Sequence, residues 1–195
     1  MDSTEKIFNV TITGYYSVGK TSLMKAMANT YDESMGYTAE FSNTDIPGKK
    51  LRLKEHLSPG KFYFYVMPDF YRDADAAIIV YSIDSYDSFS SVEEYADIIR
   101  KKNIDNVFLV ENKIDLEYDH NNYDKLLQRG YGQKKADKLG YRFYEVSALH
   151  HQNTQQLAID LLMTCISNDK KSKKEPININ DDQNESIFNR YLSKC

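Results

Sequence analysis

Eight consecutive residues of this chain have the types and spacing needed to hold a row of phosphates. Residues 14–21 read G-Y-Y-S-V-G-K-T, so the expected contacts are Gly14, Tyr15, Tyr16, Ser17, Val18, Gly19, Lys20, Thr21 and the following Ser22. In a loop of this pattern the backbone N–H groups point inward and form a nest for an anion. Lys20 would reach the terminal phosphates, and the Thr21 hydroxyl would ligate a Mg²⁺ ion that bridges them.

A second motif indicates which base accompanies the phosphates. Asn112, Lys113 and Asp115 form the pattern N-K-x-D directly after an apolar run at 107–110. A carboxylate at Asp115 accepts hydrogen bonds from the N1–H and 2-amino groups of guanine, and adenine has neither donor at that edge. The Lys113 stem would lie along the base, and Asn112 would brace the phosphate loop. The base predicted by this motif is therefore guanine.

A third segment completes the set of nucleotide contacts. A predicted strand at 143–146 is followed by Ser147, Ala148 and Leu149, where a backbone N–H is expected to meet the guanine O6. Each of the three motifs follows a predicted strand, and they occur in the order that one binding site requires. Chance is a poor explanation for all three together.

The segments around these motifs alternate between strand and helix patterns. Strands are predicted at 7–12, 50–57, 61–67, 76–82, 107–111 and 143–146, helices at 21–29 and 88–101, and a short extra helix within 116–132. The runs at 76–82 and 107–111 are continuously apolar, as in strands that helices cover on both faces. We therefore expect an α/β fold with a mostly parallel central sheet and helices on both of its faces.

With these motifs in order, residues 6–167 resemble the Ras-like small GTPases, most closely the Rab branch. The resemblance is clearest in VGKTSL, FYRDADAAIIVYSIDSYDSF, VENKIDL and EVSA. It implies a Ras-like G domain of the P-loop NTPase fold over residues 1–167, which binds GTP and GDP with Mg²⁺ and acts as a switch at intracellular membranes. It also implies effectors, an exchange factor and a prenylation escort as partners.

The second switch of that family is difficult to find in this sequence. Family members carry a D-T-A-G-Q-type segment after the third strand, in which the Asp supports Mg²⁺, the Gly senses the γ-phosphate and the Gln orients the attacking water. If 61–67 is the third strand, Asp69 takes the place of the Asp, and roughly a dozen residues of the switch are missing. No Gly or Gln follows Asp69 at a useful distance.

The first switch leaves alternatives open. Family members use a threonine there to ligate Mg²⁺ and to contact the γ-phosphate. Thr38 has nearly the expected spacing from Lys20, whereas Thr44 has the better spacing from the strand at 50–57. The remaining alternative is that neither threonine is a ligand.

Tyr16 is a further departure, because relatives carry a small residue beside the γ-phosphate. A phenol there would crowd the attacking water and an activating arginine; alternatively Tyr16 faces solvent while Tyr15 packs below it. Since phosphoryl transfer depends on positioning, we expect slow GTP hydrolysis. The competing hypothesis is a nucleotide-bound interaction module that neither hydrolyses GTP nor switches.

Length and composition restrict the remaining possibilities. The chain has 195 residues, a net charge of −4 and two cysteines, Cys165 and Cys195. We expect a cytosolic monomer without a signal peptide, a membrane span, a disulfide framework or a nucleic-acid partner. Residues 168–195 predict a disordered tail with a basic cluster at 170–174. By resemblance to Rab proteins Cys195 is a candidate for lipidation and membrane attachment, although a lone terminal cysteine could also be a free thiol.

Overall fold

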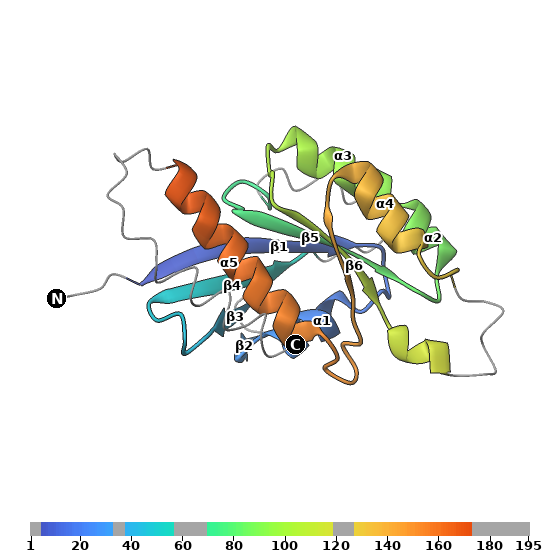
Figure 1. Ribbon diagram of the computed structural model, residues 1–195, viewed down its shortest axis with the longest axis horizontal. Helices are drawn as coiled ribbons and strands as arrows, with labels where there is room; N and C mark the ends of the chain where they lie inside the picture. Colours follow the sequence, from blue (N-terminus) through green and yellow to red (C-terminus); the bar gives the residue numbers. More distant parts are fainter. Residues whose placement is uncertain (1–4, 33–37, 57–69, 119–126, 173–195) are drawn as a thin grey trace.

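The computed structural model describes residues 5–32, 38–56, 70–118 and 127–172 (Figure 1). Its elements are β1 (Lys6–Gly14), α1 (Lys20–Met27), β2 (Thr30–Asp32), β3 (Thr38–Ser42), β4 (Lys49–Glu55), β5 (Ala76–Ser82), α2 (Tyr86–Ser90), α3 (Val92–Lys101), β6 (Val107–Asn112), the 3-10 helix η2 (Ile114–Tyr118), α4 (Tyr131–Leu139), β7 (Arg142–Glu145) and α5 (Thr154–Ser172). The alternation of strands and helices from β5 onward is that of an α/β protein.

The strands form a single sheet in the order β2-β3-β4-β1-β5-β6-β7. Strands β4, β1, β5, β6 and β7 are parallel to one another, whereas β2 and β3 form an antiparallel hairpin, and β3 pairs with β4 in antiparallel. The prediction of a mostly parallel sheet is confirmed.

Helices cover both faces of this sheet, as predicted (Figure 1). Side chains on β5 alternate between the two faces, because successive residues of a strand point to opposite sides. Ile78 and Val80 join the core cluster that contains Leu23 of α1 and Leu157 of α5. Ile79 lies in the other cluster, with residues of α3 and α4. Both faces of the central strands are therefore buried, which explains their uninterrupted apolar sequence.

The site is positioned by the place of β1 in the sheet. β1 lies between β4 and β5, so the chain crosses from one side of β1 to the other between these strands. In open α/β sheets, ligands bind beyond the carboxyl ends of the strands at such a point. The register aligns the ends of four strands there, since Ile12 lies opposite Glu55 and Ser82 lies opposite Asn112.

One strand assignment made from the sequence is wrong. The strand that pairs in parallel with β1 is β4 at Lys49–Glu55, not a strand at 61–67, which lies outside the described residues. The connection from β4 to β5 therefore covers residues 56–75, and the count from 61–67 that predicted a deletion no longer applies. Both segments are rich in β-forming residues, and the identity of the strand beside β1 depends on tertiary pairing that local patterns do not encode.

Several element boundaries also differ from the predictions. The helix predicted at 88–101 consists of two helices, α2 and α3, which meet at Ser91. Within 116–132, the structure describes the end of η2 and the start of α4, and an extra helix at 119–126 would lie outside the described residues. Helix α5 continues to Ser172, so it extends beyond the boundary at residue 167.

Candidate nucleotide-binding site

Two positions of the phosphate loop require glycine, because other atoms lie where a Cβ atom would be. Gly14 ends β1 with a φ of 147°, and a Cβ atom there would lie 2.1 Å from the Val80 carbonyl oxygen. Gly19 has a φ of 88°, and a Cβ atom there would lie 2.5 Å from Nδ2 of Asn112. Any other residue would push the loop away from β5 or from β6, so both glycines fix the path of the backbone.

Lys20 is the first residue of α1, and its charged group is folded back over the loop. The side chain is 6% exposed, and Nζ donates hydrogen bonds to the carbonyl oxygens of Gly14 at 3.1 Å and Tyr15 at 2.8 Å. Burial lowers the pKa of Lys20, and the nearby Glu55 carboxylate opposes that shift. A buried ammonium at a helix N-terminus is a strong attractor for an anion.

Tyr16 lies on the outer side of the same loop. Its side chain is 55% exposed, and its ring centroid is 4.4 Å from that of Tyr15. Tyr15 is partly buried and packs against the core on the α1 and α5 face. The structure therefore agrees with the alternative prediction, in which Tyr16 faces solvent and Tyr15 packs below it.

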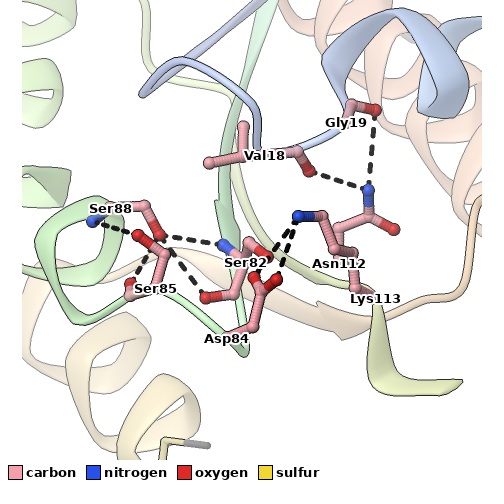
Figure 2. A network of polar contacts seen from close by, with 8 residues as sticks. All are labelled: Val18, Gly19, Ser82, Asp84, Ser85, Ser88, Asn112 and Lys113. Carbon is pink, nitrogen blue, oxygen red and sulfur yellow. Dashed lines mark hydrogen bonds and ion pairs between the residues drawn. The ribbon is translucent and has the colours of Figure 1, made fainter. Parts of the chain in front are cut away.

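Asn112 connects the three motifs found in the sequence. Its side chain is 1% exposed, and Nδ2 donates to the carbonyl oxygens of Val18 at 2.9 Å and Gly19 at 3.5 Å (Figure 2). Its Oδ1 accepts a hydrogen bond from the backbone N–H of Ala148 at 3.1 Å. One buried amide thus sets the distance between the phosphate loop and the segment after β7.

Asp115 is held on the other side of this arrangement. Its Oδ1 accepts a hydrogen bond from the Ser147 hydroxyl, and the Ser147 oxygen in turn accepts one from the backbone N–H of His150. One carboxylate oxygen is therefore engaged by the protein, which orients the carboxylate. Such a fixed acceptor suits recognition of paired N–H donors on a base edge.

A cavity of about 500 Å³ is lined by residues of the phosphate loop, of α1, of the base motif and of the segment after β7. Its lining includes predicted residues Gly19, Ser22, Asn112, Lys113, Asp115, Ala148 and Leu149, together with Lys25, Ala26, Leu116 and His151, which the sequence analysis missed. Lys25 and Ala26 could have been found from their spacing, because residues three and four positions after Ser22 share its face of the helix. This cavity is large enough for a small ligand.

Comparison with known proteins identifies the family to which this site belongs. The sequence profile of the Ras family matches residues 9–167, which is most of the chain. The chain belongs to the Ras family. Its phosphate loop, N-K-x-D motif and Ser147-Ala148 segment all lie within the matched range.

The relatives of this Ras-family chain include several Rab proteins. The chain is 30% identical to Ras-related protein Rab-21 of Homo sapiens over 162 residues, which is 79% of this chain and 70% of the relative. It is 28% identical to Ras-related protein Rab-13 of Bos taurus over 184 residues, or 88% of each chain. Ras-related protein RabF1 of Dictyostelium discoideum is 29% identical over 169 residues, which is 84% of this chain and 86% of the relative. The chain is a Rab-like member of the Ras superfamily.

In this Ras-family chain, the carboxylate at the end of the strand beside β1 belongs to Glu55. The residue is 8% exposed, and within the described part of the chain its Oε2 atom has no hydrogen-bond partner. Asp69, which the sequence analysis placed in this role, lies outside the described residues. Glu55 was missed because the strand at 61–67 was taken as the neighbour of β1.

The two candidate threonines of this Ras-family chain lie near opposite ends of the strands. Thr38 begins β3 opposite Lys54, one residue before the carboxyl end of β4. Thr44 is exposed in the turn between β3 and β4, next to the amino end of β1, where Lys49 pairs with Lys6. Of the two, only Thr38 therefore lies near the carboxyl ends of the parallel strands, where the phosphate loop begins.

Aromatic side chains join the two described ends of the connection from β4 to β5 in this Ras-family chain. His56 donates its backbone N–H to the Ile12 carbonyl at 2.8 Å, and its ring lies 4.8 Å from that of Phe70. The Tyr71 hydroxyl donates to Oγ1 of Thr13 at 3.2 Å. Burial and the nearby Lys20 charge lower the pKa of His56, which favours its neutral form at pH 7.

Glu111 places a second carboxylate below the base motif of this Ras-family chain. It precedes Asn112 on β6, is 6% exposed, and lies in register between Tyr81 on β5 and Glu145 on β7. Burial and the Glu145 charge raise its pKa from 4.5 to about 7, and the neighbouring Tyr81 side chain acts in the opposite direction. The Glu111 side chain therefore changes charge near neutral pH.

The stability of the fold should depend on pH through Glu111. Because the pKa of Glu111 is raised in the folded state, its contribution to the free energy of unfolding is complete below pH 4.5. This contribution is lost as the pH rises through about 7. Glu111→Gln stays neutral, so its gain in stability over the wild type should be below about 1 kcal/mol at pH 5 and should rise to about 1–3 kcal/mol at pH 8. Thermal and urea unfolding, followed by circular dichroism at both pH values, measure this difference.

The control for this prediction is Glu94→Gln, which removes a carboxylate from an exposed position on α3. Its effect on stability should be small and nearly the same at both pH values. An equal gain for Glu111→Gln at pH 5 and pH 8 would contradict the assignment of a neutral buried carboxyl.

Proposed function

We propose that this chain is a guanine-nucleotide-binding small GTPase that binds GTP and GDP with Mg²⁺ and hydrolyses GTP slowly. The observation that carries the proposal is the double attachment of Asn112, which holds the phosphate loop through Val18 and Gly19 and the opposite segment through Ala148. A cavity lined by Gly19 of the phosphate loop, by Ser22 of α1 and by the oriented Asp115 carboxylate suits a ligand with phosphates and a guanine base.

The donor set also fits Mg²⁺, a hard cation that prefers oxygen ligands. Thr21 on α1 would supply its hydroxyl, and Thr38, rather than Thr44, would supply a second one from β3. Glu55, in place of Asp69, would act through water; its Oε2 is buried and without a hydrogen-bond partner in the described part of the chain, as expected for an atom that a cation or its water would satisfy. A bound Mg²⁺ would neutralise charge on the β- and γ-phosphates.

Slow hydrolysis is proposed because no glutamine is present between β4 and β5. Residues 56–75 contain none, whichever residue aligns with the family's water-orienting position. Lys20 and the N–H groups of the loop would bind and neutralise the phosphates. Without a group that orients water, these contacts stabilise bound GTP more than they accelerate its cleavage.

GTP cleavage should proceed at or below about 10⁻⁴ per second in a single-turnover assay on GTP-loaded protein. Tyr16→Gly should leave this rate within about twofold, because Tyr16 faces solvent and the limiting defect is the orientation of water. The measurement is release of labelled phosphate from the loaded protein, with Tyr15→Phe as a control that preserves the ring. A large increase for Tyr16→Gly would instead assign the slow rate to crowding.

A second candidate function is a nucleotide-bound interaction module that does not switch. It is supported by the pairing of Thr38 with both Asp32 and Lys54, which fixes the start of β3 within the sheet. A switch should bind a non-hydrolysable GTP analogue and GDP with different effects on this hairpin. Equal affinity for both, together with identical hydrogen exchange in β2 and β3, would favour the module.

We propose a role in vesicle traffic at the cytoplasmic face of intracellular membranes, by analogy with the Rab relatives. Within the described part of the chain, no helix has the length and apolar character of a membrane span. Attachment would use a lipid on Cys195, a residue outside the described ranges. Effectors, an exchange factor and a prenylation escort are the proposed protein partners.

A further inference from the structure

Lys113 of the base motif is held by an acidic partner from a different element. Its Nζ lies 3.3 Å from Oδ1 and 3.2 Å from Oδ2 of Asp84, in the loop between β5 and α2 (Figure 2). Their side chains are 32% and 36% exposed. An ion pair with this exposure contributes little net energy by itself, because water screens it. Its importance must lie in what it does to the position of Lys113.

Asp84 is itself fixed by buried groups. Its Oδ1 accepts a hydrogen bond from the hydroxyl of Ser82, the fully buried last residue of β5. The backbone N–H of Ile83 donates to the Asn112 carbonyl at 3.1 Å, which ties this loop to β6 directly before Lys113. The carboxylate therefore cannot follow the lysine as a flexible surface residue would.

A pair of serines closes the same turn from the other side. The Ser88 hydroxyl oxygen accepts from the backbone N–H of Ser82 at 3.0 Å, and the hydroxyl donates to the Ser85 carbonyl at 2.7 Å (Figure 2). The Ser85 side chain accepts from the backbone N–H of Ser88 and caps α2. These contacts give the turn that carries Asp84 a single conformation.

We propose that Asp84 is a positioning residue that pre-sets Lys113 against the guanine base and thereby lengthens the residence of the bound nucleotide. A lysine side chain has four rotatable bonds, and ordering it when a ligand binds costs conformational entropy. Lys113 lines the 500 Å³ cavity, whereas Asp84 lies outside that lining and acts through the lysine. The inference rests on the proposed function, because it assigns the cavity to a guanine nucleotide.

The test is the dissociation rate of a fluorescent GDP analogue, chased with unlabelled GDP, from the full chain. Asp84→Asn should accelerate dissociation by about 3- to 10-fold, the effect expected of coupled neighbouring residues. Ser82→Ala leaves the charge of Asp84 but frees its carboxylate, so it should accelerate dissociation by a smaller factor. Asp87→Asn, an exposed carboxylate on α2, is the matched control and should have no effect.

A double-mutant cycle separates positioning from a general structural role. In a Lys113→Met background, Asp84→Asn should change the dissociation rate by less than about 1.5-fold, because the group it positions is absent. Asp84→Glu should restore part of the wild-type residence time. An undiminished effect in the Lys113→Met background, or an unchanged or slower rate for Asp84→Asn alone, would overturn the proposal. Wild-type protein that fails to bind GDP would instead reject the proposed function.

Discussion

Lys20→Ala is expected to lower the affinity for both GDP and GTP by about 10²- to 10³-fold, the effect of removing one member of a buried charge pair. Lys20 is almost completely buried, and its ammonium is held over the phosphate loop by the carbonyls of Gly14 and Tyr15. Without it, the phosphates would meet those carbonyl oxygens and the Glu55 carboxylate with no compensating positive charge. Titration with fluorescent GDP and GTP analogues measures the loss.

Lys25→Ala is the matched control for this result. It removes the same charge from the following turn of α1, where Lys25 also lines the cavity but is exposed. Its effect on affinity should be much smaller, because water screens an exposed charge. Circular dichroism confirms that both variants fold. Unchanged affinity in Lys20→Ala would place the phosphate site elsewhere in the molecule.

Asp115→Asn is expected to exchange the preference for guanine for a preference for xanthine. The amide can still accept the hydrogen bond of Ser147 through its Oδ1, so the local structure should be retained. Its NH₂ group, however, would face the 2-amino group of guanine, which leaves donors unpaired and costs about 1–3 kcal/mol or more. Xanthine carries an oxygen at that position and becomes an acceptor for the new donor.

Competition between GDP and xanthosine diphosphate for the variant measures this exchange. Asp137→Asn, an exposed substitution of the same type on α4, should alter neither affinity. Retention of full GDP affinity by Asp115→Asn, with no gain for xanthosine diphosphate, would show that Asp115 does not read the base.

The parts of the site that could be predicted from the sequence are those whose chemistry is local. Gly14 and Gly19 are fixed by a positive φ and by close approach, and this requirement is visible as glycine at a set spacing. Asn112 could be predicted because the motif that contains it follows a continuously apolar strand. In each of these cases, a few neighbouring residues carry the whole physical requirement.

The parts that could not be predicted depend on which segments pair across the sheet. The strand at Lys49–Glu55 and the segment at 61–67 have similar composition, and only the register with β1 decides between them. Counting from 61–67 led to Asp69, rather than Glu55, as the carboxylate after the strand beside β1, and to the prediction of a deletion. Thr38 and Thr44 could not be distinguished for the same reason. Spacing along the chain does not show that the two residues lie near opposite ends of the strands.

Local signals were present for some features that the analysis missed. The two serines at 85 and 88 have the spacing of a helix cap and its partner, and they mark the start of α2 at Tyr86. The break at Ser91 has no comparable signal, since the apolar spacing continues across it. Periodicity shows which residues face the core and does not show whether a helix is continuous.

The contact between His56 and Phe70 has a consequence for the evolution of this chain. Their rings are 4.8 Å apart, and backbone or side-chain hydrogen bonds of His56 and Tyr71 tie both ends of the intervening segment to β1. These contacts anchor both described ends of the segment beside the phosphate loop, which follows Ile12 and Thr13. We therefore expect evolution to conserve the aromatic character of His56, Phe70 and Tyr71.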